Sequence, residues 1–199
     1  MLRGRQRYKT HAGLVMAGNS TIDPDIVALN LRWKHGVAVG QWDDQSANNR
    51  HAVQETSGDQ AALSGGGLAF VASEGDHYDF DGTDIDIDAQ HGFAIACVLE
   101  IDSMSGTMCL LSINGVGHTL EFVNNKDNVR LKFDNATTAI SPGDGSLNDW
   151  TPDQGKFVLT IVRDAGATGN LHIYKNGVLL AQDSQAANSA GNIELNTLC

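Results

Sequence analysis

The chain has 199 residues, of which 41% are hydrophobic and 19% charged, so it has enough apolar side chains for one core and too little charge for a disordered chain. Its formal net charge of −11 argues against nonspecific binding to nucleic acid or to an anionic membrane, because both need a positive surface. Twenty-two glycines against three prolines are typical of short strands joined by tight turns, and they favour an all-β fold.

The first 22 residues are basic and lack an apolar period, and we expect them to form an extended arm outside a single domain of residues 23–199. Because the rest of the chain is acidic, such an arm is suited to dock on a neighbouring copy or on another acidic protein, and to become ordered only there. The alternative is a solvated terminus without a partner. The candidate assembly residues of the arm are Arg3, Arg5, Arg7, Lys9, Leu14, Val15 and Met16.

No segment predicts export or membrane insertion. The apolar run at residues 13–18 is too short for the core of a signal peptide, and no stretch approaches the ~18 apolar residues of a membrane span. The spacing of Cys97, Cys109 and Cys199 indicates neither a disulfide framework nor a zinc site, so we expect synthesis in a reducing cytosol.

The remaining elements follow from period and turn signals. Asp23-Pro24 predicts a short helix over residues 23–29. Strands are predicted at 29–33, 37–42, 67–72, 77–80, 93–101, 108–113, 119–123, 129–133, 157–163, 171–175 and 178–182. The nearly unbroken apolar run 93–101 predicts a central strand with both faces covered. Residues 43–50 are expected to form a loop.

Two connections stand out. Asn176-Gly177 lies between two strand patterns and predicts a two-residue hairpin, because both central residues of such a turn need positive φ. Residues 135–155 are polar and hold two prolines and three glycines, so they predict a long loop, which is a candidate functional surface.

The order of several motifs resembles the concanavalin A-like (laminin G-like) family. Residues 42–52 (WDDQSANNRHA) are similar to its W-x-D-x-S-G opening, with Ala47 in place of glycine. Residues 78–82 (YDFDG), 93–96 (FAIA) and 173–177 (IYKNG) resemble three later motifs of the family. The resemblance covers residues 29–182 and implies a jelly-roll β-sandwich of two antiparallel sheets. It also implies a closing strand, which either residues 190–199 or a partner chain would supply.

Hydrolases of this fold carry an E-x-D-x-x-E strand, and residues 100–105 (EIDSMS) are the nearest match. Retaining hydrolysis needs two carboxyl groups about 5 Å apart, and Ser105 stands where the second should be. We therefore expect no catalytic residues and no enzyme activity, and interpret Glu100 as part of a solvated strand end.

Acidic and aromatic residues suggest two ligand sites. Asp79, Asp81 and Asp84 could offer oxygen ligands to calcium, although their spacing is not that of a helix-loop-helix site and a solvated acidic edge is the alternative. Otherwise we expect no cofactor. In the long loop, Trp150 offers a stacking face for a sugar, and the polar groups beside it belong to Asn148, Asp149 and Asp153.

These features favour a non-catalytic structural or adhesive protein. Sandwich proteins of this kind with basic arms resemble the decoration, tail and fibre proteins of bacteriophages. The resemblance implies a virion protein, assembled in the host cytoplasm without a signal peptide, that binds other virion proteins, copies of itself and possible cell-surface polysaccharide. The alternative is a free carbohydrate-binding module.

Overall fold

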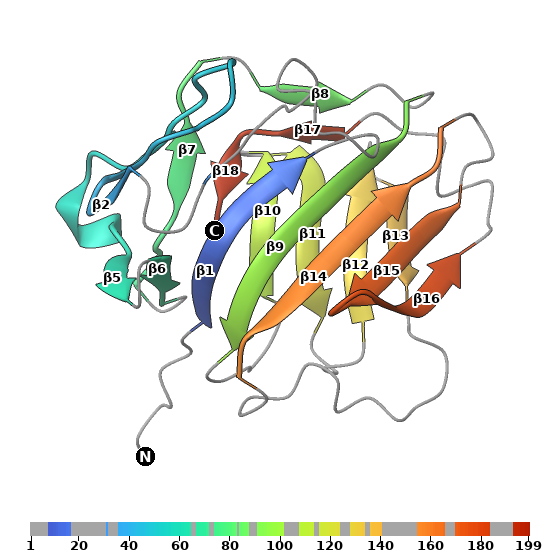
Figure 1. The fold of residues 1–199 in the computed structure, drawn as a ribbon. Helices are drawn as coiled ribbons and strands as arrows, with labels where there is room; N and C mark the ends of the chain where they lie inside the picture. Colours follow the sequence, from blue (N-terminus) through green and yellow to red (C-terminus); the bar gives the residue numbers. More distant parts are fainter. Residues whose placement is uncertain are drawn as a thin grey trace.

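The computed structural model describes residues 8–16, 31, 36–64, 67–71, 74–82, 84–87, 91–101, 108–113, 116–123, 128–133, 136–140, 155–165, 170–183 and 193–199. For several strands, among them residues 8–16 and 128–133, only the backbone is described. The described chain consists mostly of antiparallel strands, which confirms the predicted all-β fold (Figure 1). Among its helices none is long and apolar enough to cross a membrane.

One large sheet has seven strands in the order β16-β15-β14-β9-β1-β6-β5. Its central strand is β9, which has the predicted bounds and pairs with β1 on one side and β14 on the other. In chain order the strands are β1 (Tyr8–Met16), β5 (Ala62–Ser64), β6 (Gly67–Phe70), β9 (Phe93–Ile101), β14 (Phe157–Arg163), β15 (Leu171–Lys175) and β16 (Val178–Asp183).

The other large sheet has nine strands in the order β13-β12-β11-β10-β18-β7-β4-β3-β2. Their bounds are β2 (Val37–Ala38), β3 (Gln41–Trp42), β4 (Ala52–Val53), β7 (Tyr78–Phe80), β10 (Met108–Ile113), β11 (Val116–Val123), β12 (Asn128–Phe133), β13 (Ala136–Ile140) and β18 (Thr197–Leu198). A small third sheet pairs β8 (Ile85–Ile87) with β17 (Ile193–Leu195).

The core lies between the two large sheets. In Figure 1, β1, β9, β14, β15 and β16 lie in front of β10, β11, β12 and β13. Apolar side chains from both layers form one buried cluster, including Ile95 and Ile161 of the front sheet and Leu111 and Leu120 of the rear sheet. Strict alternation along β9, with every second residue buried, turns one face of that strand into the cluster.

The loop predicted at residues 43–50 is built around the buried carboxylate of Asp44. Its Oδ1 accepts a hydrogen bond from Ser46 N (2.9 Å), and its Oδ2 accepts from Ser46 Oγ (2.6 Å) and from Arg50 N (2.9 Å). Trp42 just before the loop is buried in the core. The W-x-D-x-S part of the motif is therefore a tryptophan anchor followed by an aspartate-organised turn.

The predicted arm is wrong for residues 8–16. They form β1 inside the seven-stranded sheet, where Tyr8 pairs with both Phe70 and Ile101. The segment mixes basic and small residues with its apolar ones, so its sequence lacks the apolar period of a half-buried strand. Residues 1–7 and 17–22 of the predicted arm, with Arg3, Arg5 and Arg7, lie outside the described residues.

Two further strand predictions need correction. Residues 37–42 form the hairpin β2–β3 and not one strand, because Gly40 takes a φ of +89° and turns the chain back. Residues 136–140 of the predicted long loop form β13, paired with β12 at the edge of the sheet. The predicted helix 23–29 lies outside the described residues.

Residues 193–199, which we name the closing segment, supply the closing strand from the chain itself. β17 pairs with β8, and β18 inserts between β7 and β10. Beside β18, Cys199 and Cys109 of β10 form a disulfide bond that spans 90 residues of sequence. The cysteine spacing did not indicate this bond, since two isolated cysteines carry no signature of their pairing.

Candidate functional site

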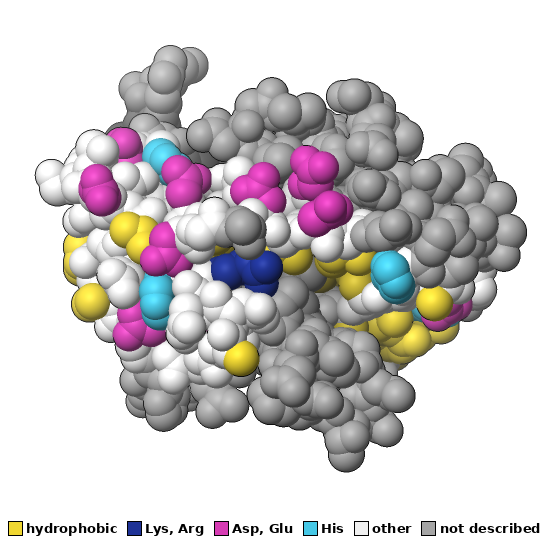
Figure 2. All heavy atoms as spheres, turned by 90° about the horizontal axis from the view of Figure 1, so that it is seen from above, with side chains coloured by type: hydrophobic (Ala, Val, Ile, Leu, Met, Phe, Trp, Pro, Cys, Tyr) yellow, Lys and Arg dark blue, Asp and Glu magenta, His cyan; other side chains and the backbone are white. Residues whose placement is uncertain are grey.

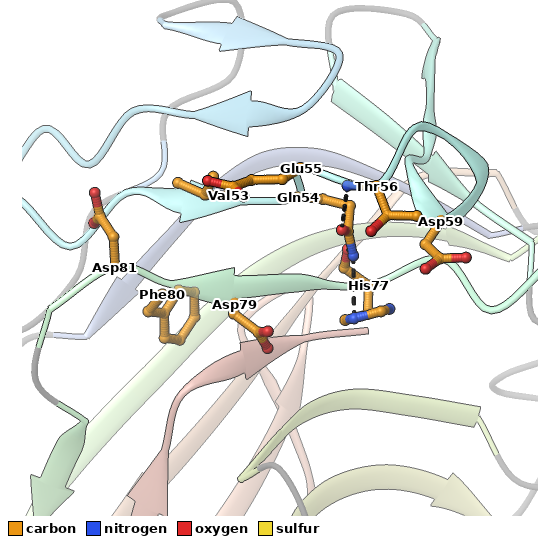
Figure 3. A pocket seen from close by; sticks show the side chains of 9 residues that line it. All are labelled: Val53, Gln54, Glu55, Thr56, Asp59, His77, Asp79, Phe80 and Asp81. Carbon is orange, nitrogen blue, oxygen red and sulfur yellow. Dashed lines mark hydrogen bonds between the residues drawn. The ribbon is translucent and has the colours of Figure 1, made fainter.

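A pocket of about 470 Å³ opens beside β4 and β7, on the nine-stranded sheet (Figure 3). These strands are in register, with Ala52 opposite Phe80 and Val53 opposite Asp79. The chain after β4 continues along the pocket into a short 3-10 helix, η2 (Ser57–Asp59). The lining residues are Val53, Gln54, Glu55, Thr56, Asp59, His77, Asp79, Phe80 and Asp81.

Gln54 organises this pocket through its side-chain amide. Its Nε2 donates to the carbonyl oxygen of His77 (3.1 Å), and its Oε1 accepts from Thr56 N (2.9 Å). On the backbone, Gln54 N donates to Gly40 O (2.8 Å). The Gln60 side chain donates to the carbonyl oxygen of Gln54 (2.7 Å). A buried amide with these partners holds β4, η2 and the start of β7 in one arrangement.

The same contacts fix the protonated nitrogen of His77. Its Nδ1 lies 2.8 Å from Gly75 O, which can only accept, so Nδ1 carries the hydrogen. Its Nε2 lies 3.1 Å from Gln54 Nε2, which can only donate, so Nε2 accepts. The imidazole thus lies at the pocket with both ring nitrogens in hydrogen bonds that hold it in place.

The charge of the pocket is negative. Glu55, Asp59, Asp79 and Asp81 contribute carboxylates, and no lysine or arginine is among the lining residues. Figure 2 shows acidic side chains, in magenta, spread across the described part of the face seen from above. This surface favours ligands that donate hydrogen bonds or carry positive charge.

Asp76 adds a buried carboxyl behind His77. Burial raises the pKa of Asp76, while the hydrogen bond from Val71 N to its Oδ2 (2.7 Å) opposes that rise. Its Oδ1 is buried without a hydrogen-bond partner among the described residues. Asp76 therefore connects the residue that follows β6 to the segment that precedes β7, and burying its carboxyl group away from water costs free energy.

The predicted calcium residues do not converge. Asp79 and Asp81 line the pocket, but in Figure 3 their side chains extend in different directions from β7. Asp79 Oδ1 accepts from Thr197 Oγ1 (2.9 Å), and Asp84 Oδ1 accepts from Asn196 Nδ2 (3.2 Å), so both contact the closing segment. Among the described residues no three acidic, histidine or cysteine side chains are grouped closely enough to hold a metal ion. Calcium stays a prediction.

The other predicted sites are only partly described. Trp150, Asn148, Asp149 and Asp153 lie outside the described residues, as does Ser105. Glu100 is the next-to-last residue of β9, where it is half-buried and lies opposite Lys9 of β1. Leu14, Val15 and Met16, predicted to anchor the arm, lie in β1, where Val15 pairs with Ala96 and Met16 with Ile95.

Sequence reasoning missed an apolar surface on the front sheet, which we name the outer face. It comprises residues that alternate with buried ones in β9 (Ala94, Ala96 and Val98), β14 (Val158, Thr160 and Val162) and β15 (Tyr174), together with Leu179 of β16, which pairs with Tyr174. Glu100 and His172 lie on the same face. The register places Val98 opposite Val158 and Ala96 opposite Thr160. Val158 is 39% exposed and Leu179 47% exposed.

The outer face is turned toward the viewer in Figure 1, and no described strand lies in front of it. A sheet face in contact with water normally carries polar side chains, so this composition is typical of a surface that is covered in a complex. The prediction that both faces of 93–101 are covered holds within the described residues for one face only; the other is half-buried.

Comparisons with known proteins gave no further assignment: no family model, no curated protein and no solved structure matched this chain significantly.

Proposed function

We propose that this chain is a non-catalytic structural or adhesive protein of a bacteriophage virion, with a concanavalin A-like jelly-roll fold. It binds neighbouring virion proteins or copies of itself through the outer face. Its place in the particle would be that of a capsid decoration, tail or fibre component. The motifs of the sequence support the family and the setting, and the apolar outer face supports a role in assembly.

The outer face is the observation that carries the proposal. The apolar residues of β9 and β14 lie side by side in register, so they form a continuous surface and not isolated exposed side chains. Polar groups stand at its margins, where Glu100 is the next-to-last residue of β9 and His172 lies opposite Val162. An apolar centre with a polar margin is the usual anatomy of a protein–protein interface.

A charge placed on the outer face tests the proposal. We expect the wild type to sediment as an oligomer, and Val158→Glu to shift it to the monomer, because a buried unpaired carboxylate is costly at an interface. The matched control is Val39→Glu, since Val39 is 54% exposed in the β2–β3 hairpin of the other sheet. Analytical ultracentrifugation measures the effect, and circular dichroism checks the fold.

A second experiment uses bacteriophage particles. Mass spectrometry of bacteriophage particles from the same source should detect this chain, and added wild type should co-sediment with particles that lack it, whereas Val158→Glu should not. A monomeric wild type that is absent from particles and does not bind them would contradict the proposal.

The second candidate function is a free carbohydrate-binding module, and the pocket beside β4 and β7 favours it. Sugar hydroxyls donate hydrogen bonds, and the pocket is lined by carboxylates, which accept them, and by Phe80. Binding of the isolated monomer to a glycan array, lost in Asp81→Ala, would support this function over the assembly role. Trp150, with Asn148, Asp149 and Asp153, remains a proposed second contact for such a ligand.

A further inference from the structure

The closing strand β18 occupies a position on which the nine-stranded sheet depends. Leu198 pairs with Tyr78 of β7 on one side and with Leu111 of β10 on the other. All described pairing between the β10–β13 half and the β7–β2 half of the sheet therefore passes through Thr197 and Leu198. A strand of two residues joins two groups of four.

The ladder of this strand is short, with two residue pairs on each side, and neighbouring backbone hydrogen bonds extend it. Cys199 N donates to Leu110 O (3.2 Å), Asn196 N donates to Ser112 O (2.9 Å), and Phe80 N donates to Asn196 O (2.6 Å). Thr197 and Leu198 are both buried. A strand of this length buries little apolar area by itself, and a short ladder is prone to local opening.

The Cys109–Cys199 disulfide adds the stability that the short ladder of β18 does not provide. The Cα atoms of Cys109 and Cys199 lie 5.6 Å apart, within the range that a disulfide spans. The bond closes a loop of 90 residues, and the stabilisation by a disulfide grows with the length of the loop in the chain-entropy model. It fastens the residue that follows β18 to the neighbouring strand β10.

We infer that Cys109 and Cys199 form a redox switch that controls whether the closing strand stays inserted between β7 and β10. In the oxidised protein the bond keeps β18 in the sheet. Reduction breaks the sulfur–sulfur bond: two molecules of a small thiol give two protein thiols and one small-molecule disulfide. The reverse exchange with glutathione disulfide restores the bond, so atoms and electrons balance in both directions.

The third cysteine does not interfere with this exchange. Cys97 is buried in β9, and burial raises the pKa of its thiol to about 12, so it holds almost no thiolate at neutral pH. The thiolate is the attacking species in disulfide exchange. Cys97 therefore serves as an internal control, and the inference does not rest on the proposed virion role.

The test compares the wild type, Cys199→Ser and Cys97→Ser, each treated with glutathione disulfide or with dithiothreitol. We expect dithiothreitol to lower the Tm of the wild type by on the order of 10 °C, as the loop length implies. Cys97→Ser should respond in the same way. Cys199→Ser should have the lower Tm in both conditions and show no response.

Hydrogen exchange locates the effect and distinguishes a switch from general destabilisation. On reduction, amides of residues 196–199, 78–80 and 110–112 should exchange faster, while those of β14 and β15 keep their protection. Peptide mass spectrometry after alkylation should show Cys109 and Cys199 joined in the oxidised sample. Two free thiols after glutathione disulfide, or an unchanged Tm and exchange pattern with dithiothreitol, would overturn the inference.

Discussion

The side chain of Asp44 shows how one residue can determine the shape of a loop. Asp44 is 5% exposed, and three donors from Ser46 and Arg50 converge on its two carboxylate oxygens. Its own backbone N–H donates to His51 Nδ1 (3.1 Å), which joins the two ends of the same loop. The loop is thus held by a charged acceptor and not by chain stiffness.

Replacing Asp44 with alanine should destabilise the protein by roughly 2–4 kcal/mol, because it leaves donors around a buried site without their acceptor. Urea denaturation of the variant and the wild type measures this difference. The control is Asp86→Ala, whose side chain is exposed on β8 and should change stability by no more than about 0.5 kcal/mol. Equal effects of the two substitutions would show that the hydrogen bonds of Asp44 do not add to the free energy of unfolding.

Among the elements, the β15–β16 hairpin was predictable from the dipeptide Asn176-Gly177 alone. Asn176 and Gly177 have φ values of 51° and 78°, as a two-residue turn of this kind requires. Asn176 also reaches the neighbouring strand, since Val158 N donates to its Oδ1 (2.8 Å). The turn therefore connects three strands of the front sheet.

We predict that Asn176→Val combined with Gly177→Val costs about 3–4 kcal/mol, because β-branched residues resist positive φ and valine cannot replace the amide acceptor. Thermal unfolding measures the loss. Asn176→Asp, which keeps an acceptor and tolerates the turn, should unfold close to the wild-type temperature. A double variant that melts with the wild type would mean that the turn is not needed for the sheet.

Most strands were predictable because their signal is local. The apolar run of β9, the strand patterns of β14 and β15 and the glycine-containing turns are properties of neighbouring residues. By contrast, β1 and β13 were missed because their identity as strands depends on partners elsewhere: β1 is completed by β6 and β9, and β13 by β12. The outer face and the Cys109–Cys199 bond were missed for the same reason, since both are relations between strands far apart in sequence.

At the scale of the whole molecule, β1 divides the predicted arm of residues 1–22 into three parts: residues 1–7, the strand itself and residues 17–22. Residues 8–16 fill the gap between β6 and β9, and the contact of β1 with β9 runs along nearly its whole length, from Tyr8 to Met16. Residues 1–7, with Arg3, Arg5 and Arg7, precede the strand. Residues 1–7 can act as an assembly arm without removing a strand residue from the sheet.

Two truncations separate these roles. Deleting residues 1–7 should leave a cooperative unfolding transition, because no strand residue is lost, and any assembly that depends on the three arginines should weaken. Deleting residues 1–16 should abolish the transition, since β6 and β9 lose a shared partner in mid-sheet. Circular dichroism and calorimetry measure both. A cooperative transition in the longer truncation would show that β1 is dispensable.

The pairing of β1 with a strand far along the chain affects how the protein folds during its synthesis on the ribosome. Tyr8 is synthesised long before Ile101, its partner in β9, and Tyr78 of β7 long before Leu198, its partner in β18. Each large sheet therefore has strand edges that stay unpaired while the residues between these partners are being synthesised. Such late, long-range pairing slows folding and exposes the chain to aggregation. During recombinant production, the growing chain and not the finished protein is therefore the form most in need of chaperones.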